Sequence, residues 1–547
     1  MRHEPCPDTW HPYPSMFARF IQEDPTLSAF FPYKRSDPRA WNERLDWLKA
    51  RSWPGRQELA RALADHQMRL GAGGPSVRNA RLLGEEGTVA VVSGQQVGLL
   101  TGPLYTIYKA VTVLQLARKA EEDLGVPVVP VFWAASDDHD FDEVNSVFVQ
   151  DTEGEVRNLK LSWRPTTADS LGYVPLPLDV RSPVGEMEAL LRGRWEAREV
   201  SMRVLADAER SSTISEWFQR LMARLFRETG LVILDPCLKE IKRQMGPVLH
   251  QALLHSSSVT LELEAAEEGL RKRGFVPGLE PDRSQGHLFY RHRGHRLGLV
   301  WTEDERLTDR GGRLEEPLSV KEVARLLRET PEDFSPNVAL RPVCQEHLLP
   351  VLAHVSGPGE VAYLCQMREV FTLFDHQMPI IYPRLSVTLV EEQQEDILIQ
   401  KGLGAGDIPG ALSERLIAEM RRLDELDMEC AFEDFRKTMA SRYRQALEPI
   451  LGLDPGLKHL SEQNLGLILS QVSYMEKKAL QYRRRRHRDL VRSFRILGEA
   501  IMPRRRPQET VLNVFPFIAR NGWDLPRRLG QLPLDQGHLV VYLGGRG

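Results

Sequence analysis

The amino-acid sequence predicts an α/β protein with a Rossmann-like parallel-sheet core, two insertions and an antiparallel α-helical coiled coil. Three observations predict this class. Two β-branched runs, Val89–Val92 and Val126–Trp133, flank a helical pattern over Leu104–Leu124, and strand–helix–strand units form parallel sheets. Two later stretches alternate and are rich in turn residues, as antiparallel strands are. After Glu391 the strand signals give way to long charged helices.

The chain is expected to divide into seven segments. In order, they are the first part of the core (1–150), a first insertion (151–212), the second part of the core (213–258), a second insertion (259–335), the third part of the core (336–390), the coiled-coil domain (391–502) and a C-terminal return to the core (503–547).

The first core helix has sequence signals at both ends. Thr101 is a candidate N-cap, Pro103 suits the first turn, and Gly125 suits the C-terminus. Ser93–Gln96 before it reads as a polar turn.

Further strands follow from apolar or alternating runs. We expect core strands at Leu231–Pro236 and Pro379–Arg384. Alternation predicts antiparallel strands, listed in chain order as Glu155–Trp163, Gly172–Pro177, His287–Arg291 and Arg296–Trp301.

The coiled-coil domain is expected to be two long helices, Ala411–Leu447 and Leu457–Leu497, joined by the turn Gly452–Gly456. Its proposed apolar seam comprises Leu416, Met420, Leu423 and Leu426 on one arm and Leu467, Leu469, Val472 and Met475 on the other. Because an apolar stripe of this length is normally buried against a partner, we expect a homodimer.

Composition is ordinary for a globular protein, with 42% hydrophobic and 27% charged residues. A net charge of −4 gives no reason to expect nucleic-acid or membrane binding. The five cysteines are scattered without a CxxC, and the N-terminus has no apolar signal-peptide segment, so we expect reduced thiols and a cytoplasmic protein.

Two loops follow the carboxyl ends of the first two core strands, where α/β sheets bind ligands. The first loop contains Ser93, Gly94, Gln95, Gln96, Thr101 and Gly102. Because it opens onto a helix N-terminus, it is a candidate site for phosphate or carboxylate, which Lys109 would reach. The alternative is that its glycines only shape a tight connection and that Lys109 is solvated.

The second loop holds five carboxylates within Asp137–Glu143, around His139. Closely packed acids favour a cation or a shared proton. They would therefore bind a divalent metal for a nucleotide, or supply a general base for an attacking amine. The alternative is a solvated acidic loop with helix caps. The catalytic candidates are Asp137, Asp138, His139, Asp140 and Lys109.

Two further segments supply candidate binding residues. Ser356, Gly357, Gly359 and Glu360 form a glycine turn that would cradle an anion, unless geometry alone requires it. Arg384 and Ser386 follow a strand and suit phosphate or carboxylate. Cys344 and His347 are too few for a zinc site, so no residue is assigned as a metal ligand.

These motifs resemble one family. GQQVGLLTGPLYTIYKA (94–110) and VPVVPVFWAASDDHDFDEVN (126–145) closely resemble the cysteine ligases of bacillithiol biosynthesis, the BshC family. Matches continue in SGPGEVAYLCQMREVF, PIIYPRLSVTLVEE and QETVLNVFPFIARNG, and the resemblance extends from Phe17 to the C-terminus. The matching motifs add Tyr105, Gln508 and Asn513 to the candidate substrate- or nucleotide-binding residues.

The resemblance implies a core like that of nucleotidyltransferases and class I aminoacyl-tRNA synthetases, with two connecting-peptide insertions and a dimeric coiled coil, although the HIGH and KMSKS signatures are missing. It implies that L-cysteine is joined to the amine of glucosaminyl-malate. An amide does not form spontaneously from a carboxylate and an amine, so we expect ATP as activator, with Mg²⁺ as an optional companion.

Two other functions fit the same sequence features. One is a nucleotide-binding scaffold or regulatory protein whose coiled coil recruits partners. The other is a sugar-nucleotide-dependent transferase, which would use the same crevice but bind a nucleotide sugar instead of cysteine.

Overall fold

The computed structural model describes residues 1–6, 13–191, 195–423, 427–534 and 537–544. It contains two compact units, which we treat separately: Met1–Glu392 with Arg506–Gly547, and Gln393–Arg505. No helix among the described residues is long and apolar enough to span a membrane.

The core of the first unit is a sheet of five parallel strands. Its strands are β2 (Val89–Gln96), β3 (Val128–Ala135), β6 (Val232–Leu234), β11 (Val351–Ser356) and β12 (Ile380–Pro383). They lie side by side in the order β6-β3-β2-β11-β12. In chain order this is 3-2-1-4-5, the Rossmann arrangement, which reverses direction between β2 and β11. The predicted Rossmann-like parallel core is therefore confirmed.

Helix α5 (Leu104–Leu124) connects β2 to β3, and Gly125 ends it in a left-handed conformation, as predicted. Two local predictions were wrong. Ser93–Gln96 is not a turn, because β2 pairs with β3 without interruption from Val89 to Gln96. Thr101 is not the N-cap, because it lies in a separate 3₁₀ turn and α5 begins after Pro103.

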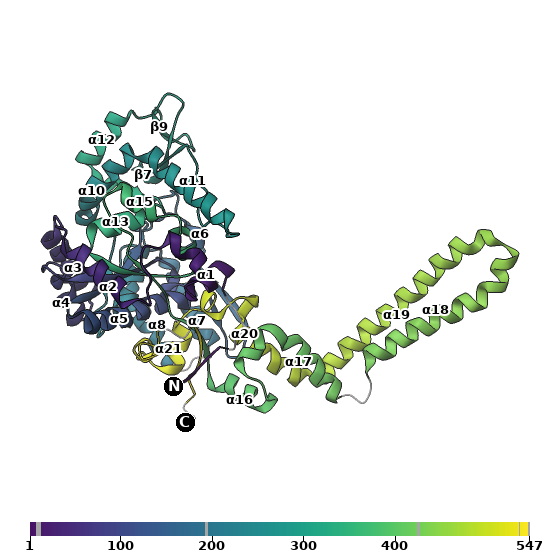
Figure 1. The fold of residues 1–547 in the computed structure, drawn as a ribbon. Coiled ribbons are helices and arrows are strands. Elements are labelled where there is room, and N and C mark those ends of the chain that lie inside the picture. The colour runs from purple at the N-terminus through teal and green to yellow at the C-terminus, as the bar shows by residue number, and fades with distance from the viewer. Residues whose placement is uncertain (7–12, 192–194, 424–426, 535–536, 545–547) are drawn as a thin grey trace. The chain divides into compact units, whose positions relative to one another are not determined.

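Helices flank the sheet and build most of the surrounding layers (Figure 1). Before β2 come α1 (Ser15–Ile21), α2 (Pro38–Lys49), α3 (Arg56–Leu70) and α4 (Gly74–Leu82). Between β3 and β12 come α6 (Phe141–Val144), α7 (Arg181–Leu190), α8 (Trp195–Ala208), α9 (Ile214–Leu225), α10 (Lys239–Leu254), α11 (Ser256–Lys272), α12 (Val320–Glu329), α13 (Arg341–Leu348), α14 (Pro358–Leu364) and α15 (Arg368–Leu373).

The antiparallel strands were predicted less accurately in the first insertion than in the second. In the first, β4 (Ser146–Gln150) pairs with β5 (Val156–Lys160), and Gly172–Pro177 contributes only an isolated bridge instead of a strand. In the second, β7 (Gln285–His292) and β8 (His295–Trp301) form the predicted hairpin. β9 (Leu307–Asp309) and β10 (Phe334–Pro336) complete a four-stranded sheet in the order β10-β7-β8-β9.

A three-stranded sheet joins the two ends of the described chain. β14 (His538–Tyr542) lies between β1 (Arg2–Pro5) and β13 (Ser386–Val390), so the N- and C-terminal segments lie close together (Figure 1). Helices α21 (Phe515–Asn521) and α22 (Leu525–Leu529) precede β14.

The second unit is helical, as predicted, and its long arms α18 (Met428–Leu453) and α19 (Lys458–Arg486) run side by side (Figure 1). α16 (Glu392–Lys401), α17 (Ile408–Leu423) and α20 (Arg488–Ile501) complete it. The expected two continuous helices are each divided. Asp427 caps a new helix by accepting a hydrogen bond from Cys430 N, and His487 ends α19.

The predicted seam is only partly correct. Met420 is buried against Leu490 and Phe494, and Val472 is buried on the second arm. Leu467 and Met475 are instead more than half exposed, and Leu426 lies outside the described residues. In α19 the buried positions Leu465 and Val472 are one heptad apart in an unbroken helix, so the predicted residues Leu467 and Met475 lie on a neighbouring, exposed face.

Candidate active site

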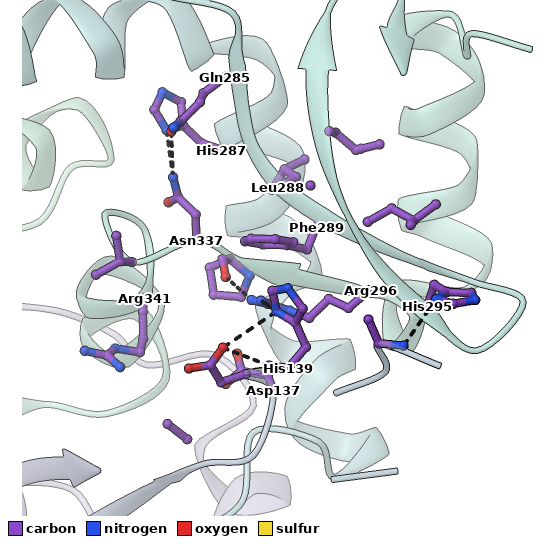
Figure 2. A pocket seen from close by; sticks show the side chains of 18 of the residues that line it. Asp137, His139, Gln285, His287, Leu288, Phe289, His295, Arg296, Asn337 and Arg341 are labelled. Atoms are coloured by element: carbon purple, nitrogen blue, oxygen red, sulfur yellow. Dashed lines mark hydrogen bonds and ion pairs between the residues drawn. The ribbon is translucent and has the colours of Figure 1, made fainter. Parts of the chain in front are cut away.

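A cavity of about 760 Å³ lies at the carboxyl ends of β2 and β3. Gly94–Gln96 and Asp137–His139 line one wall, and residues of the β7–β8 hairpin line the opposite wall. Figure 2 shows Arg296 and Phe289 of the hairpin close to His139 and Asp137. Lys109 and Glu360 also line the cavity. The cavity therefore lies beside the point between β2 and β11 where the strand order reverses, which is where sheets of this order bind ligands.

Lys109 is fixed at the inner end of the cavity by three acceptors. Its Nζ donates to Gly94 O (2.8 Å) and Gln95 Oε1 (2.9 Å) and pairs with Glu360 Oε2 at 2.6 Å. Burial lowers the pKa of Lys109, and the negative charge of Glu360 partly offsets this decrease. Burial alone would raise the pKa of Glu360, but Lys109 outweighs it and holds that pKa below its ordinary value. This is a charged, internally satisfied pair.

Gln96 holds the acidic loop against the end of β2. Its Nε2 donates to Asp138 Oδ2 (2.6 Å) and to Glu143 Oε2 (2.7 Å), and His139 N donates to Asp138 Oδ1 (2.8 Å). Burial favours the neutral form of Asp138, but hydrogen bonds from His139 and Gln96 outweigh burial and hold the pKa of Asp138 below its ordinary value. Asp138 is therefore a carboxylate at neutral pH and a weak base.

The hairpin contributes a buried guanidinium to the cavity. Arg296 Nε donates to Ser335 Oγ (3.0 Å) and its Nη2 to Pro336 O (3.1 Å). Its guanidinium carbon lies 3.5 Å from the centre of the Phe289 ring. Gly298 leaves room for that ring, because a Cβ there would lie 3.3 Å from Phe289 Cε1.

His139 lies between a cation and a carboxylate. Arg296 Nη1 lies 3.1 Å from His139 Nδ1, and a guanidinium only donates hydrogen bonds. Asp138 Oδ1 lies 3.7 Å from the same nitrogen. A neutral ring that accepts from Arg296 at Nδ1 carries its proton on Nε2.

The hairpin is tied to the acidic loop through one intervening segment. Arg296 N donates to Ala168 O (2.8 Å), and Ala168 N donates to His295 Nδ1 (3.2 Å). Three residues further along, Leu171 N donates to Asp138 O (2.7 Å). Loop and hairpin are thus parts of one hydrogen-bonded wall.

Asp137 and Arg341 differ from these residues in how few contacts they make. Asp137 is 4% exposed and lines the cavity, and its carboxylate makes no hydrogen bond or ion pair with any described residue. Arg341 donates from Nη2 to Tyr363 Oη (2.8 Å). Figure 2 shows Asp137 and Arg341 on the same side of the cavity.

Another part of the hairpin wall is polar but uncharged. His287 is buried, with Nδ1 3.0 Å from Asn337 Nδ2 and Nε2 2.8 Å from Thr260 Oγ1. Because the amide nitrogen donates, the His287 proton is on Nε2. Burial lowers the pKa of His287 to about 4.

The predicted anion site at the N-terminus of α5 does not face the cavity. The segment Leu512–Asn513 covers that helix end instead: Leu104 N donates to Leu512 O (2.8 Å). Asn513 Nδ2 donates to Leu100 O (2.6 Å) and Gly102 O (2.7 Å). Gly102 and Asn513 therefore join two chain segments away from the cavity, whereas Gly94, Gln95 and Gln96 of the same predicted loop line it.

Much of the predicted second glycine turn is also structural. Ser356 Oγ bonds to His354 Nδ1 (2.9 Å), and Gly357 N donates to Glu360 Oε2 (2.8 Å). Of the residues predicted in this turn, only Glu360 lines the cavity, and Gly359 does not. Gly357 N–H is therefore already used within the turn. Ser93 similarly joins strands, donating from Oγ to Val355 O (2.7 Å).

Arg384, Ser386 and Gln508 belong to a separate buried network. Arg384 Nη2 pairs with Glu509 Oε1 at 2.7 Å, and Ser386 Oγ donates to Glu509 Oε2 at 2.7 Å. The side-chain amide of Gln508 accepts from Leu389 N and donates to Leu389 O, both at 2.8 Å. It thus satisfies the backbone of β13 as a neighbouring strand would. We call Arg384, Ser386, Gln508, Glu509 and His538 the C-terminal network. Its members hold β13 and do not line the cavity, contrary to the prediction.

Tyr105 and Asp140 lie at the margins of the cavity. Tyr105 Oη is 3.4 Å from Gln95 Nε2 and does not line it. Asp140 caps α6 by accepting hydrogen bonds from Asp142 N and Glu143 N. It lines a shallow groove of about 670 Å³ that shares Asp138 and His139 with the cavity. Of the catalytic candidates, Asp137, Asp138, His139 and Lys109 therefore line the cavity itself.

The sequence did contain a signal for the hairpin residues that prediction missed. Arg291 and Arg296 stand directly opposite each other in the hairpin, where like charges repel. Such a pair requires acidic partners elsewhere. Arg291 pairs with Asp169 at 2.8 Å, and the charges of Asp137 and Asp138 act on Arg296. Asn337 and Arg341, by contrast, carry no comparable signal.

Among the residues that the structure describes, no group of three or more His, Cys, Asp or Glu side chains is arranged to hold a metal ion. Cys344 is buried, and the His347 ring lies against His376 with 5.9 Å between ring centres.

Comparison with known proteins gives consistent matches over both units. Residues 6–385 match the family described as bacillithiol biosynthesis BshC, N-terminal Rossmann-like domain, and residues 387–543 match its C-terminal coiled-coil domain. A protein of Symbiobacterium thermophilum named "Putative cysteine ligase BshC" is 35% identical, covering 96% of this chain and 97% of its own. A protein of the same name from Heliobacterium modesticaldum is 34% identical, covering 94% and 95%.

Proposed function

This chain belongs to the BshC family of bacillithiol biosynthesis, and from that premise we propose that it is a cysteine ligase. The reaction is amide formation between the carboxyl group of L-cysteine and the amine of glucosaminyl-malate, the last step of the pathway. One observation of the structure carries the proposal: a cavity at the reversal point of a Rossmann sheet holds carboxylates and cations together. The substrates present the same two classes of charge, ammonium and carboxylate.

Amide formation needs an activated acyl donor, because a free carboxylate does not react with an amine in water. ATP, with Mg²⁺ as its companion, supplies that activation in our proposal. The cationic groups Arg341 and Lys109 line the cavity and suit carboxylate or phosphate oxygens, although Lys109 is already paired. They would orient the acyl donor and offset the charge that develops on its oxygen.

The remaining wall residues prepare the cavity for the amine. His139 lines the cavity and contacts Arg296 through Nδ1, so its Nε2 is the ring nitrogen left for a ligand. Asp137 offers oxygen acceptors for an ammonium group of a bound substrate. Phe289 and other hairpin residues line the cavity, where they would limit the water that could hydrolyse an activated acyl group.

Reconstitution tests the proposal. Purified protein with L-cysteine, glucosaminyl-malate, ATP and Mg²⁺ is expected to produce bacillithiol, detected by mass spectrometry. Omission of each component, and addition of EDTA, define the requirements for ATP and metal. His139→Ala is expected to lower kcat/KM, whereas Asp123→Asn on the far end of α5 serves as a matched surface control.

No product under any of these conditions would contradict the proposal. Thermal stabilisation by a nucleotide sugar but not by cysteine would instead favour a sugar-nucleotide-dependent transferase. Nucleotide binding without turnover would favour a scaffold.

We propose further that the second unit makes the protein a homodimer. Its long arms expose large apolar side chains, among them Phe435, Leu467, Tyr474 and Met475. Exposed apolar surface of this extent is characteristic of a contact surface. Sedimentation at micromolar concentration is expected to show a dimer, and deletion of Glu391–Ile501 is expected to give a monomer. A monomeric full-length chain would contradict this proposal.

A further inference from the structure

The charged groups of the cavity divide into saturated and unsaturated ones. Lys109 is bonded to three acceptors, and Asp138 accepts from Gln96 and from its neighbour's backbone. Arg296 donates to Ser335 and Pro336 and contacts His139. These groups shape the cavity but have few positions left for a ligand.

Asp137 is the clearest unsaturated anion. Its side chain is 4% exposed, and no hydrogen bond or ion pair within the described chain involves its carboxylate. A buried carboxylate without partners costs free energy, so such a group is normally completed by a ligand. Asp137 lines the cavity, which is the space from which a ligand would reach it.

Arg341 is the corresponding unsaturated cation. It stands at the first position of α13 and lines the same cavity. A guanidinium carries five N–H donors, and within the described chain Tyr363 Oη is the acceptor to which Arg341 donates. The remaining donors suit a carboxylate, which accepts two parallel hydrogen bonds from arginine.

The charge of Asp137 reaches Arg341 without a contact between them. Tyr363, Glu360 and Asp137 raise the pKa of Arg341 against the effect of burial. No ion pair joins Asp137 to Arg341, although opposite charges in such a site attract strongly. A gap between unpaired opposite charges is the arrangement that a zwitterion fills.

We propose that Asp137 and Arg341 form a subsite for the α-amino acid substrate. Asp137 binds its α-ammonium group, and Arg341 binds its α-carboxylate. This inference rests on the proposed cysteine ligase function and assigns L-cysteine to these two side chains. A metal ion is a poorer occupant, because Asp137 does not belong to any group of described residues arranged to ligate one.

Ligand analogues test the subsite on the unmodified protein. Binding is measured by calorimetry under reducing conditions, with and without a non-hydrolysable ATP analogue. The ligands are L-cysteine, cysteamine, which lacks the carboxylate, and 3-mercaptopropionate, which lacks the amine. L-cysteine is expected to bind about 10- to 100-fold more tightly than either analogue, because each loses one charge-assisted contact. Equal affinity for all three would overturn the inference.

Variants of each residue, tested against each analogue, then show which side chain binds which charged group of the ligand. Asp137→Asn is expected to weaken the binding of L-cysteine about 10- to 100-fold and to leave the binding of 3-mercaptopropionate unchanged. Arg341→Met is expected to weaken the binding of L-cysteine by a similar factor and to leave the binding of cysteamine unchanged. Asp123→Asn is the matched control for Asp137→Asn, and thermal unfolding checks that each variant is folded. Equal weakening of all three ligands by both variants would also overturn the assignment.

Steady-state kinetics separate this inference from the proposed function. With wild-type turnover established, Asp137→Asn is expected to raise KM for cysteine more than KM for glucosaminyl-malate. The reverse pattern would overturn the subsite while leaving the ligase function standing. Binding of L-cysteine with the predicted preferences but without amide product would support the subsite and contradict the proposed function.

Discussion

The cavity and the C-terminal network are both rich in buried charge, yet they differ in whether that charge is satisfied. In the C-terminal network, Arg384, Ser386 and Glu509 bond one another, and Val387 N also donates to Glu509. In the cavity, Asp137 and Arg341 face a space without pairing. Both regions follow strands and both contain predicted site residues. Internal saturation distinguishes a structural network from a site that awaits a ligand.

The first prediction breaks the C-terminal network. Arg384→Met is expected to lower the free energy of unfolding by about 3–5 kcal/mol, because Glu509 would remain buried without its partner. Urea denaturation measures the loss. The double variant Arg384→Met/Glu509→Leu is expected to recover much of it, because no charge is then left unpaired. A single variant as stable as wild type would contradict the structural role.

The second prediction compares the pH response of the cavity wall. Burial lowers the pKa of His287 to about 4, below the unfolded value of about 6.5. The unfolded chain therefore binds the proton more readily, and stability falls as pH drops from about 6.5 to about 4. The contribution of His287 is about 3 kcal/mol over that window.

His287→Asn is expected to flatten that pH dependence, measured as unfolding free energy between pH 7 and pH 4. Asparagine is chosen because it tolerates the positive φ of 57° at this position. His538 in the C-terminal network also has a pKa lowered by burial to about 4, so part of the acid sensitivity is expected to remain. An unchanged pH slope in His287→Asn would show that His287 does not titrate as expected.

The third prediction concerns Asp140, at the edge of the cavity. Asp140→Ala is expected to cost about 1 kcal/mol, because it removes the N-cap of α6. Thermal unfolding measures this effect, while kcat/KM is expected to change little. A large loss of activity with an unchanged fold would restore Asp140 as a catalytic candidate.

The smallest expected effect on stability is that of Asp137→Asn. Because Asp137 is buried without a partner in the described chain, Asp137→Asn is expected not to lower the free energy of unfolding, since the folded state then no longer buries an unpaired charge. The same variant is expected to lose L-cysteine affinity. Loss of stability comparable to Arg384→Met would show that Asp137 belongs to a structural network and would remove the distinction between the two regions.

Periodicity and apolar runs in the sequence correctly predicted those structural elements that depend mainly on residues close in the chain. The periodicity of 104–124 and the flanking apolar runs correctly predicted the first strand–helix–strand unit. The acidic loop was correctly expected at a strand end, because apolar Val128–Ala135 leads directly into it. Alternation likewise predicted the β7–β8 hairpin, although not its position over the cavity.

Contacts between distant segments account for the errors. Arg296 reaches His139 across 157 positions, and no local pattern specifies that contact. Asn513 covers the start of α5 from more than 400 positions away, which removed a site that helix geometry alone predicts. Arg384 looked suited to phosphate, but its partner Glu509 comes from the C-terminal segment. Sequence patterns identified residues able to bind anions, and tertiary contacts decided which of them remain available.

The most direct test of the ligase proposal is the thiol profile of a bacillithiol-producing host that lacks this gene. Mass spectrometry is expected to show loss of bacillithiol and accumulation of glucosaminyl-malate. The wild-type gene is expected to restore the profile, and the Asp137→Asn gene, expressed to the same level, is expected to restore it poorly. An unchanged thiol profile in the deletion strain, with no second gene of the family present, would contradict the central claim.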